Sequence, residues 1–449
     1  MTTTKYIILA LALSISPVAG AADLLEIYHA AQSQDAVFAA AQATQRAGQE
    51  KLPQGRSLLL PSVNLNASST YNNNWIQYRG AFLIPNVGTL PLPNGAMQFN
   101  SNGYGVTLTQ PLFRQQNWVV YTEAELQVTQ TDAQFKAAEQ NLIVRVAQAY
   151  FDVLIAQDSV DLAEAQKNAI SEQLAQAKRN FEVGTATVTD TYEAQARYDL
   201  TNSQEIAAQS NLEIKKRALQ QIVNANPGDL RHLGKELKLD ALQSSNVGKW
   251  LDDAQQGSLQ IVVAQAGAEL AEKEVARNRG GHYPTVDLVA SYSQNSAGNG
   301  AFGFGSDGHS QAIGVQLNLP LYQGGEVQSK LREAEANHDR AKEELENTRR
   351  NVELQTRQAY LGVVDGIAQV KALQQALKSS ESLLEASKLG QDVGVRTNLD
   401  VLNAQQQLYS TRRDLYQAEY NYLISQLQLK AAVGTLAEDD LAKINQALY

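Results

Sequence analysis

The second half of the chain carries an apolar seam whose spacing alternates between four and three residues. It lies in a stretch of about 65 residues that begins at residue 324 and contains no proline. Its members are Val352, Thr356, Ala359, Val363, Gly366, Val370, Leu373, Leu377, Ser380, Leu384 and Ser387. Steps that average 3.5 residues keep one side of a helix against a partner and favour a left-handed coiled coil. The pattern predicts a very long helix in a packed wall of helices or, alternatively, a solitary dimeric coiled coil.

A polar turn at 392–400 and a second proline-free run follow this helix, so a long helical hairpin is predicted over about 324–433. The same arrangement, with a turn at 182–190, predicts another hairpin over about 117–224. A helix of this size is on the order of 100 Å long, because each residue advances it by ~1.5 Å. Ordinary globular helices run only about 8–20 residues.

In four segments the hydrophobic period changes to two, which predicts β-strands with one apolar and one polar face. Apolar residues such as Val63 and Leu65 alternate there with polar ones such as Asn64 and Asn66. The four segments are about 61–72, 100–112, 284–294 and 310–321. A stretch with three prolines and several Gly and Asn at 73–97 predicts a long loop within the first strand pair, and a Gly-rich stretch at 296–308 predicts a loop within the second.

The chain contains an internal duplication. Pro111 and Pro320 are 320 − 111 = 209 residues apart, and three further pairs are 210 apart. Those pairs are Tyr150 and Tyr360, Gly184 and Gly394, and Asp190 and Asp400. Each repeat therefore reads helix, strand, strand, long helix, turn, long helix. We place repeat 1 at 22–226 and repeat 2 at 258–434, separated by 227–257 and followed by 435–449.

The shorter elements are read from local periodicity. An amphipathic helix over 23–51, ended by Pro53, opens repeat 1, and another over 258–279 opens repeat 2. The segment 227–257 is poorly periodic and predicts short helices with a small strand.

Residues 1–21 predict a secretory signal peptide. Lys5 precedes an apolar run of about ten residues, and Ala19, Gly20 and Ala21 fit the small-residue cleavage pattern, which places the mature start at Ala22. Ten residues are too few to span a bilayer, which needs about 20. No later segment is apolar enough for a transmembrane helix, so an exported chain would enter a membrane as strands.

Four strands of this length fit a membrane barrel, since a tilted spanning strand needs about 9–11 residues. Four strands cannot close a barrel, because small closed barrels have about eight. Closure would therefore use several chains, and three chains would supply twelve strands. The alternative is a soluble antiparallel sheet with one wet face, which the same alternation permits.

Composition excludes several classes of function. The net charge of −10 disfavours nucleic acid as a partner, and the absence of cysteine removes disulfides, thiolate metal sites and cysteine nucleophiles. No catalytic or metal-ligand spacing is present, and the five histidines are scattered. The glycines at 303, 305 and 308 formally match a dinucleotide fingerprint but open no helix. We therefore predict no enzyme activity, no cofactor and no metal.

The chain resembles the TolC family of outer-membrane export channels over essentially its whole mature length. The phrases that carry the resemblance are L-P-L-Y-Q-G-G at 319–325, D-V-G-V-R-T-N-L-D-V-L-N-A-Q at 392–405 and Y-N-Y-L-I-S-Q-L-Q-L-K-A-A-V-G-T-L at 420–436. The resemblance implies an α+β homotrimer of a Gram-negative outer membrane. It would have a twelve-stranded β-barrel, four strands per chain, continued by a periplasmic α-helical barrel of coiled-coil hairpins. The segments 227–257 and 435–449 would form an equatorial belt.

The resemblance also implies a closed periplasmic entrance held by links between hairpins, with acidic rings inside it. The residues at matching positions are Thr189, Asp190, Gln391, Arg396, Asp400 and Asn403. Gln391 and Asn403 depart from the family pattern, which has tyrosine and aspartate there. An Arg396–Asp190 link is expected as a charged hydrogen bond. From the residues alone, the alternative is that Asp190 and Asp400 are each the N-cap of the helix that follows the turn.

The resemblance implies export of proteins, drugs or both across the outer membrane. The partners would be a periplasmic adaptor, an inner-membrane ABC or proton-driven pump, and outer-membrane lipid. We predict that the hairpin tips touch the adaptor. The tip residues are Val183, Gly184, Thr185, Val393, Gly394 and Val395. The rival interpretation is a periplasmic coiled-coil adaptor or structural stalk, which would usually lack the duplicated strand pairs.

Overall fold

The computed structural model describes residues 21–77, 79, 82–86, 88–90, 94–234, 237, 239, 246–299 and 304–448. The predicted signal peptide lies outside this part except for Ala21. The chain forms two compact units, one of residues 1–43, 134–261 and 349–449, and one of 44–133 and 262–348. In the described part of the chain, no helix combines the length and apolar character needed to cross a membrane.

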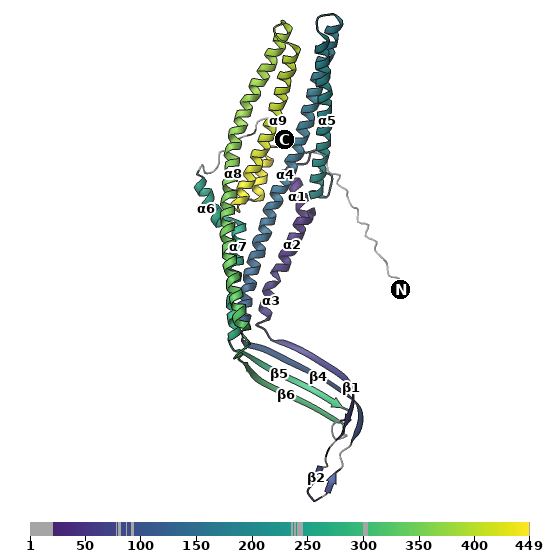
Figure 1. The fold of residues 1–449 in the computed structure, drawn as a ribbon, viewed down its shortest axis with the longest axis vertical. Helices are drawn as coiled ribbons and strands as arrows, with labels where there is room; N and C mark the ends of the chain where they lie inside the picture. The colour runs from purple at the N-terminus through teal and green to yellow at the C-terminus, as the bar shows by residue number, and fades with distance from the viewer. Residues whose placement is uncertain are drawn as a thin grey trace, which may run out of the picture. The chain divides into compact units, whose positions relative to one another are not determined.

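The second unit contains a four-stranded antiparallel sheet in the order β1, β4, β5, β6 (Figure 1). Its strands are β1 (Ser62–Ile76), β4 (Gly95–Phe113), β5 (Thr285–Ala297) and β6 (Ser306–Asn318). Between β1 and β4 the chain forms a small hairpin of β2 (Phe82–Ile84) and β3 (Gly88–Leu90). The pairing of β4 with β5 joins the two repeats in one sheet.

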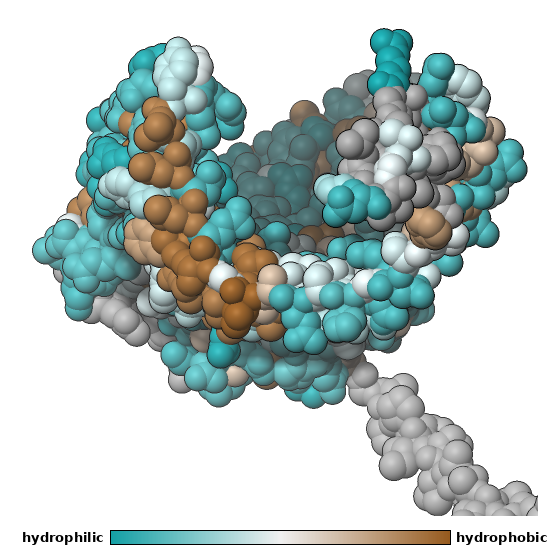
Figure 2. Space-filling model, turned by 90° about the horizontal axis from the view of Figure 1, so that it is seen from below, coloured by the Kyte–Doolittle hydropathy of each residue, from teal (hydrophilic) through white to brown (hydrophobic). Residues whose placement is uncertain are grey.

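Apolar residues lie in register across the sheet. Val63 pairs with Leu108, Leu108 with Ala290, and Ala290 with Ile313, which forms one row over all four strands. Neighbouring side chains in such a row lie on the same face and stabilise the pairing. Val63 and Ile313 stay exposed, and Figure 2 shows apolar residues gathered in a continuous band on the face seen from below.

The strands run further than the sequence predicted. Residues 73–76 and 95–98, expected in a loop, continue the β1–β4 ladder, with Asn74 opposite Met97. Likewise Ala297 pairs with Ser306 inside the second expected loop. These strand ends are rich in Asn, Gly and Ser and have no apolar alternation. Backbone pairing with the neighbouring strand holds them in the sheet. β6 instead stops at Asn318, before Pro320, which has no N–H for the ladder.

The start of the long helix of repeat 1 is tied to the sheet by a bidentate ion pair. Arg114 donates from Nε to Asp287 Oδ1 at 2.8 Å and from Nη2 to Asp287 Oδ2 at 2.6 Å. Two parallel bonds of this kind fix direction as well as distance. The register of β4 against β5 shifts between Pro111 and Phe113, immediately before this pair.

The helix expected over 23–51 is divided into α1 (Leu24–Gln34), α2 (Ala36–Gln49) and α3 (Lys51–Ser57). Asp35 is extended, and its Oδ2 accepts from the Phe38 N–H at 2.9 Å, so it ends one helix and caps the next. The expectation that Pro53 ends the helix is wrong. Pro53 stands in the first turn of α3, where the missing N–H costs no helical bond.

The remaining helices include both long hairpins. They are α4 (Gln115–Glu182), α5 (Val188–Val223), α6 (Val247–Gly257), α7 (Leu259–Arg279), α8 (Glu326–Asp392), α9 (Asn398–Ala432) and α10 (Glu438–Asn445), with a 3₁₀ turn η1 (Gly280–His282). The predicted seam forms the inner side of α8, since each of its residues is buried or half-buried. Gly366 allows close packing there, because a Cβ would lie 3.4 Å from that of Tyr422.

Aromatic residues of α4 and α9 form the centre of the first unit. Tyr150, Phe151 and Tyr420 are almost fully buried, and the Phe151 and Tyr420 rings lie 5.4 Å apart. The Tyr150 hydroxyl donates to the carbonyl oxygens of Ala22 and Arg231 at 3.2 and 2.9 Å. One buried phenol thereby holds the start of the described chain beside the segment that follows α5.

A polar cluster adjoins these rings. The Tyr420 hydroxyl donates to Asp158 at 3.0 Å, and His232 Nδ1 lies 3.7 Å from the same carboxylate. Asp158 raises the pKa of His232 mainly by accepting its hydrogen bond. Glu419, only 8% exposed, lies next to Tyr420, and burial raises its pKa to about 7, despite a hydrogen bond from Gln374.

We predict that the free energy of unfolding decreases as pH rises from about 5 to about 8. Folded Glu419 keeps its proton up to a pKa of about 7, whereas an unfolded glutamate loses it near 4.5, so the folded state binds more protons in this range. Glu123, raised to about 7, and His232 act in the same direction. For Glu419 alone the effect is at most about 3 kcal/mol.

Chemical unfolding at pH 5, 6.5 and 8 measures this slope. Glu419→Gln should flatten it, and Glu213→Gln, which changes a carboxylate that is 60% exposed, should leave it unchanged. A parent protein with equal stability at all three pH values would contradict the assignment.

Candidate functional site: the hairpin tips

The two hairpin tips have the same backbone geometry. Gly184 and Gly394 have φ values of 78° and 76°, which favour glycine because other residues meet a steric penalty there. Just beyond each glycine, the N–H of Thr185 or Val395 donates to the carbonyl of Asn180 or Gly390, at 2.8 Å in both tips. These bonds satisfy carbonyls that the helix end leaves free. The two repeats thus share equivalent hydrogen bonds at their tips, as well as a similar sequence.

Each outgoing helix begins with a capping box. Thr187 and Thr397 are the N-caps of α5 and α9, and each accepts from the backbone N–H of an aspartate three residues later. That aspartate, Asp190 or Asp400, accepts in return from the threonine N–H at 2.8 Å. The alternative interpretation of Asp190 and Asp400 as N-caps is therefore wrong in position: the threonines are the N-caps, and the aspartates complete the capping boxes from inside the first turn. Both aspartates are half-buried in these first turns.

The Arg396 guanidinium lies near Asp400. Its Nη1 is 3.7 Å from Asp400 Oδ1, and among the described residues it makes no ion pair with Asp190 inside the chain. The Arg396 stem crosses Gly390, where an added Cβ would come within 2.6 Å of Arg396 Cγ. The Thr397 hydrogen bonds, together with Arg396, lower the pKa of Asp400. Asp400 therefore stays ionised to a lower pH than an ordinary aspartate does.

The other three expected gate residues differ in their contacts. Gln391, in the last turn of α8, donates to Asn398 Oδ1 at 3.3 Å and so closes its own hairpin. Thr189 is exposed in the first turn of α5. Asn403, exposed on α9, accepts a hydrogen bond from Arg197 of α5 at 3.0 Å.

Sequence reasoning missed two residues of this region. Gly390 needs no unusual φ, and its role appears only where the Arg396 stem crosses it. The sequence feature that could have indicated it is a glycine inside a helical pattern, seven residues before Thr397. Arg197 looked like one more charge on a solvated helix face, and nothing in its spacing indicates that it reaches α9.

The tip side chains project outward. Val183, Val393 and Val395 are 72%, 67% and 79% exposed. A Cβ on Gly184 or Gly394 would meet no described atom within 4 Å. Apolar residues so exposed at a rigid turn suit contact with another protein. Among the described residues, no group of three or more His, Asp or Glu is arranged to hold a metal ion, and Gly303 of the formal dinucleotide match lies outside them.

Comparison with known proteins identifies the family of the chain. The outer membrane efflux protein family matches residues 27–225 and 250–435. The chain belongs to this family. It is 35% identical over 454 residues to the outer membrane protein TolC of Escherichia coli, covering 98% of this chain and 88% of the relative. Its identity to TolC of Vibrio cholerae is 33% over 437 residues, covering 97% and 96%.

Solved structures agree on the fold. The outer membrane protein VceC of Vibrio cholerae superposes with a TM-score of 0.76 at 21% identity, covering 92% of this chain and 96% of that one. The chain is therefore an outer-membrane export channel of the TolC family, a family of transport proteins and not of enzymes. The interpretation as a periplasmic adaptor or stalk is set aside.

We predict that Thr397→Ala loosens the first turn of α9. The variant loses the threonine oxygen that accepts from the Asp400 N–H, and removal of an N-cap costs about 1 kcal/mol. Hydrogen exchange of the amides after residue 397 should become faster, by about fivefold for a loss of that size. Thr189→Ala, an exposed threonine without a capping role, is the matched control. Equal exchange in both variants would contradict the role of the capping box.

Proposed function

We propose that three copies of the chain close one channel in the outer membrane. Among the described strands, β1 and β6 have only one neighbour each, so both edges of the sheet are open. Unpaired backbone groups cannot remain in a bilayer, so each edge needs the edge of another copy. Three copies give twelve strands with the apolar rows toward lipid, and this open-edged sheet is the observation that carries the proposal. The helical hairpins then continue the channel through the periplasm.

The channel acts as a passive conduit without enzymatic activity. Energy comes from an inner-membrane ABC or proton-driven pump, which a periplasmic adaptor couples to the helical end. The apolar, exposed tips support docking of such an adaptor, because their valines are open to contact and share one hydrogen-bonded turn geometry. Arg396, Asp190 and Asp400 of the three chains meet at the entrance, where links between chains favour its closed state. Gln391 donates within its own hairpin, and we assign it no link between chains.

The cargo we propose is a secreted protein. The relatives named proteases secretion protein PrtF, of Dickeya chrysanthemi, and alkaline protease secretion protein AprF, of Pseudomonas aeruginosa, are both 31% identical over 98% and 93% of this chain. Relatives named for efflux, such as BepC of Brucella suis, match less of it, at 27% over 75%. Drug efflux is the second candidate, supported by those names and by the family description.

We predict that the purified protein is a trimer in detergent and conducts ions in planar bilayers. The closed sheet gives the bilayer an apolar outer surface and leaves a water-filled lumen. Native mass spectrometry measures the assembly, and single-channel recording measures the conduction. Substitution of Val315 by Asp on the apolar face of β6 should abolish insertion, whereas Gln316→Asp on the other face should retain it. A monomer, or a trimer that does not conduct, would reject the conduit.

We predict that Val393→Asp combined with Val395→Asp abolishes secretion of the cargo protein. A buried charge disrupts an apolar contact, so the adaptor should no longer crosslink to the tip. Conductance of the purified variant should equal that of the parent, since the sheet is untouched. The double variant Val393→Ala and Val395→Ala is the milder control. Parent-level crosslinking and secretion by the aspartate variant would show that the tips are free of the adaptor.

A further inference from the structure

A single side chain joins the two repeats close to their tips. Arg197 of α5 donates from Nη2 to Asn403 Oδ1 at 3.0 Å and from Nη1 to Gln406 Oε1. Asn403 and Gln406 are three residues apart and share one side of α9, which lies against α5. We refer to Arg197, Asn403 and Gln406 as the arginine clasp. It bonds one hairpin directly to the other.

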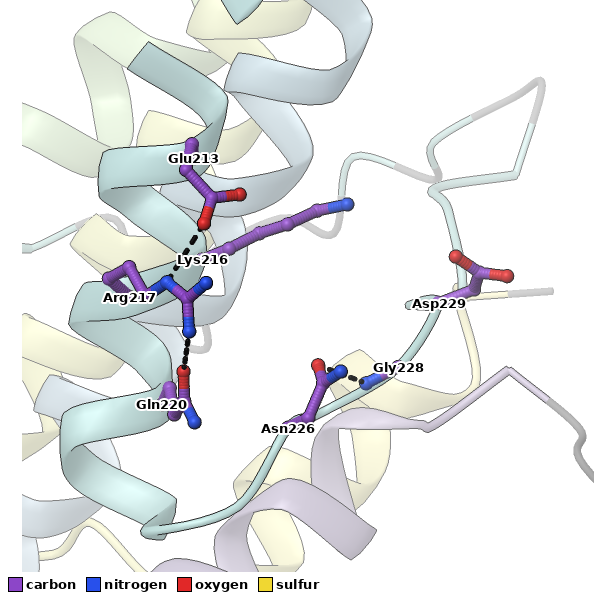
Figure 3. A pocket seen from close by; sticks show the side chains of 7 residues that line it. All are labelled: Glu213, Lys216, Arg217, Gln220, Asn226, Gly228 and Asp229. Carbon is purple, nitrogen blue, oxygen red and sulfur yellow. Dashed lines mark hydrogen bonds and ion pairs between the residues drawn. The ribbon is translucent and has the colours of Figure 1, made fainter. Parts of the chain in front are cut away.

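The acceptors of the clasp are neutral. A guanidinium is usually bonded to a carboxylate, whose charge cancels its own. Arg217, twenty residues further along α5, shows that situation: its Nε donates to Glu213 Oε1 at 2.8 Å, and its Nη1 donates to Gln220 (Figure 3). Among the described residues, no carboxylate lies within 4 Å of the Arg197 guanidinium. Its positive charge is therefore not cancelled by the groups that hold it.

The clasp lies just beyond the acidic residues of the tips. Asp190 and Asp400 are in the first turns of α5 and α9, and Arg197 follows Asp190 by seven residues, ~10 Å further along the helix. The residue of repeat 2 at the matching position, 197 + 210 = 407, is Gln407. The positive charge therefore belongs to repeat 1 alone and occurs once per chain.

We propose that Arg197 lowers the cation selectivity of the channel entrance and tethers its two hairpins. This inference rests on the proposed trimeric conduit, in which three clasps surround the path behind the ring of Asp400. Three uncancelled positive charges attract anions and so reduce the cation preference that the Asp400 ring sets. The two bonds of the guanidinium also oppose separation of α5 from α9. Cargo thus meets negative and then positive charge as it enters.

Two substitutions separate the charge from the tether. Arg197→Gln removes both, so the cation-to-anion permeability ratio in a KCl gradient should rise about twofold or more, with higher single-channel conductance. Arg197→Lys keeps the charge, but one ammonium cannot reproduce the planar fork to two amides. Its ratio should stay at the parent value while its conductance rises. Arg217→Gln, on the same helix, should change neither quantity.

The outcomes distinguish this inference from the function on which it rests. A parent protein that does not conduct rejects the conduit itself. If the parent conducts and Arg197→Gln keeps its permeability ratio, Arg197 does not set selectivity. A ratio that changes equally in Arg197→Lys shows that shape and not charge matters. If Arg197→Gln fails to assemble, Asn403→Asp replaces it, because the new carboxylate cancels the charge with Arg197 in place. That variant should raise the ratio and lower the conductance, and an unchanged ratio overturns the proposal.

Discussion

The open backbone edges of β1 and β6 are the constraint on which the rest of the structure depends. A strand edge exposes a row of N–H and C=O groups that must find partners, most of all away from water. In the described strands the sheet ends at β1 and β6, so neither edge is satisfied within the chain. The duplication meets half of this demand by pairing β4 with β5. In the trimer that we propose, the edges of other copies meet the remainder, and their number sets how many hairpins surround the path.

Periodicity made the main elements predictable. Burial repeats about every 3.5 residues along the seam of α8, and apolar residues alternate with polar ones along the strands, so the seam and the four strands could be located from apolar positions alone. Prediction failed where a single residue, and not the hydrophobic period, determines where a helix begins or ends. Asp35 divides the first helix by capping Phe38, and Pro53 fits a first turn that pattern alone could not place. The strand ends beyond Asn72 are held by register, which polar residues do not reveal.

The sequence predicted where the residues of the site lie, but not which residues they contact. Resemblance located Asp190, Arg396 and Asp400 in the turns, but Arg396 contacts Asp400 of its own helix start. The positions of Arg197 and Gly390 depend on helices that approach each other in three dimensions, and a periodic pattern does not determine that approach. Asn403, located by resemblance as a gate position, accepts a hydrogen bond from the Arg197 guanidinium, which the sequence did not indicate. An aspartate at this position would cancel the charge of Arg197.

The pairing of β4 with β5 also governs the order in which the chain can fold. Tyr104 and Gln294 are neighbours across the sheet, yet 190 residues separate them in the chain. The β1–β4 hairpin forms from local sequence, but its second edge has no partner until repeat 2 has emerged. Closing so long a loop is slow and leaves an apolar sheet edge open to aggregation in the meantime. The long separation of β4 from β5 in the chain therefore makes their pairing a late step of folding.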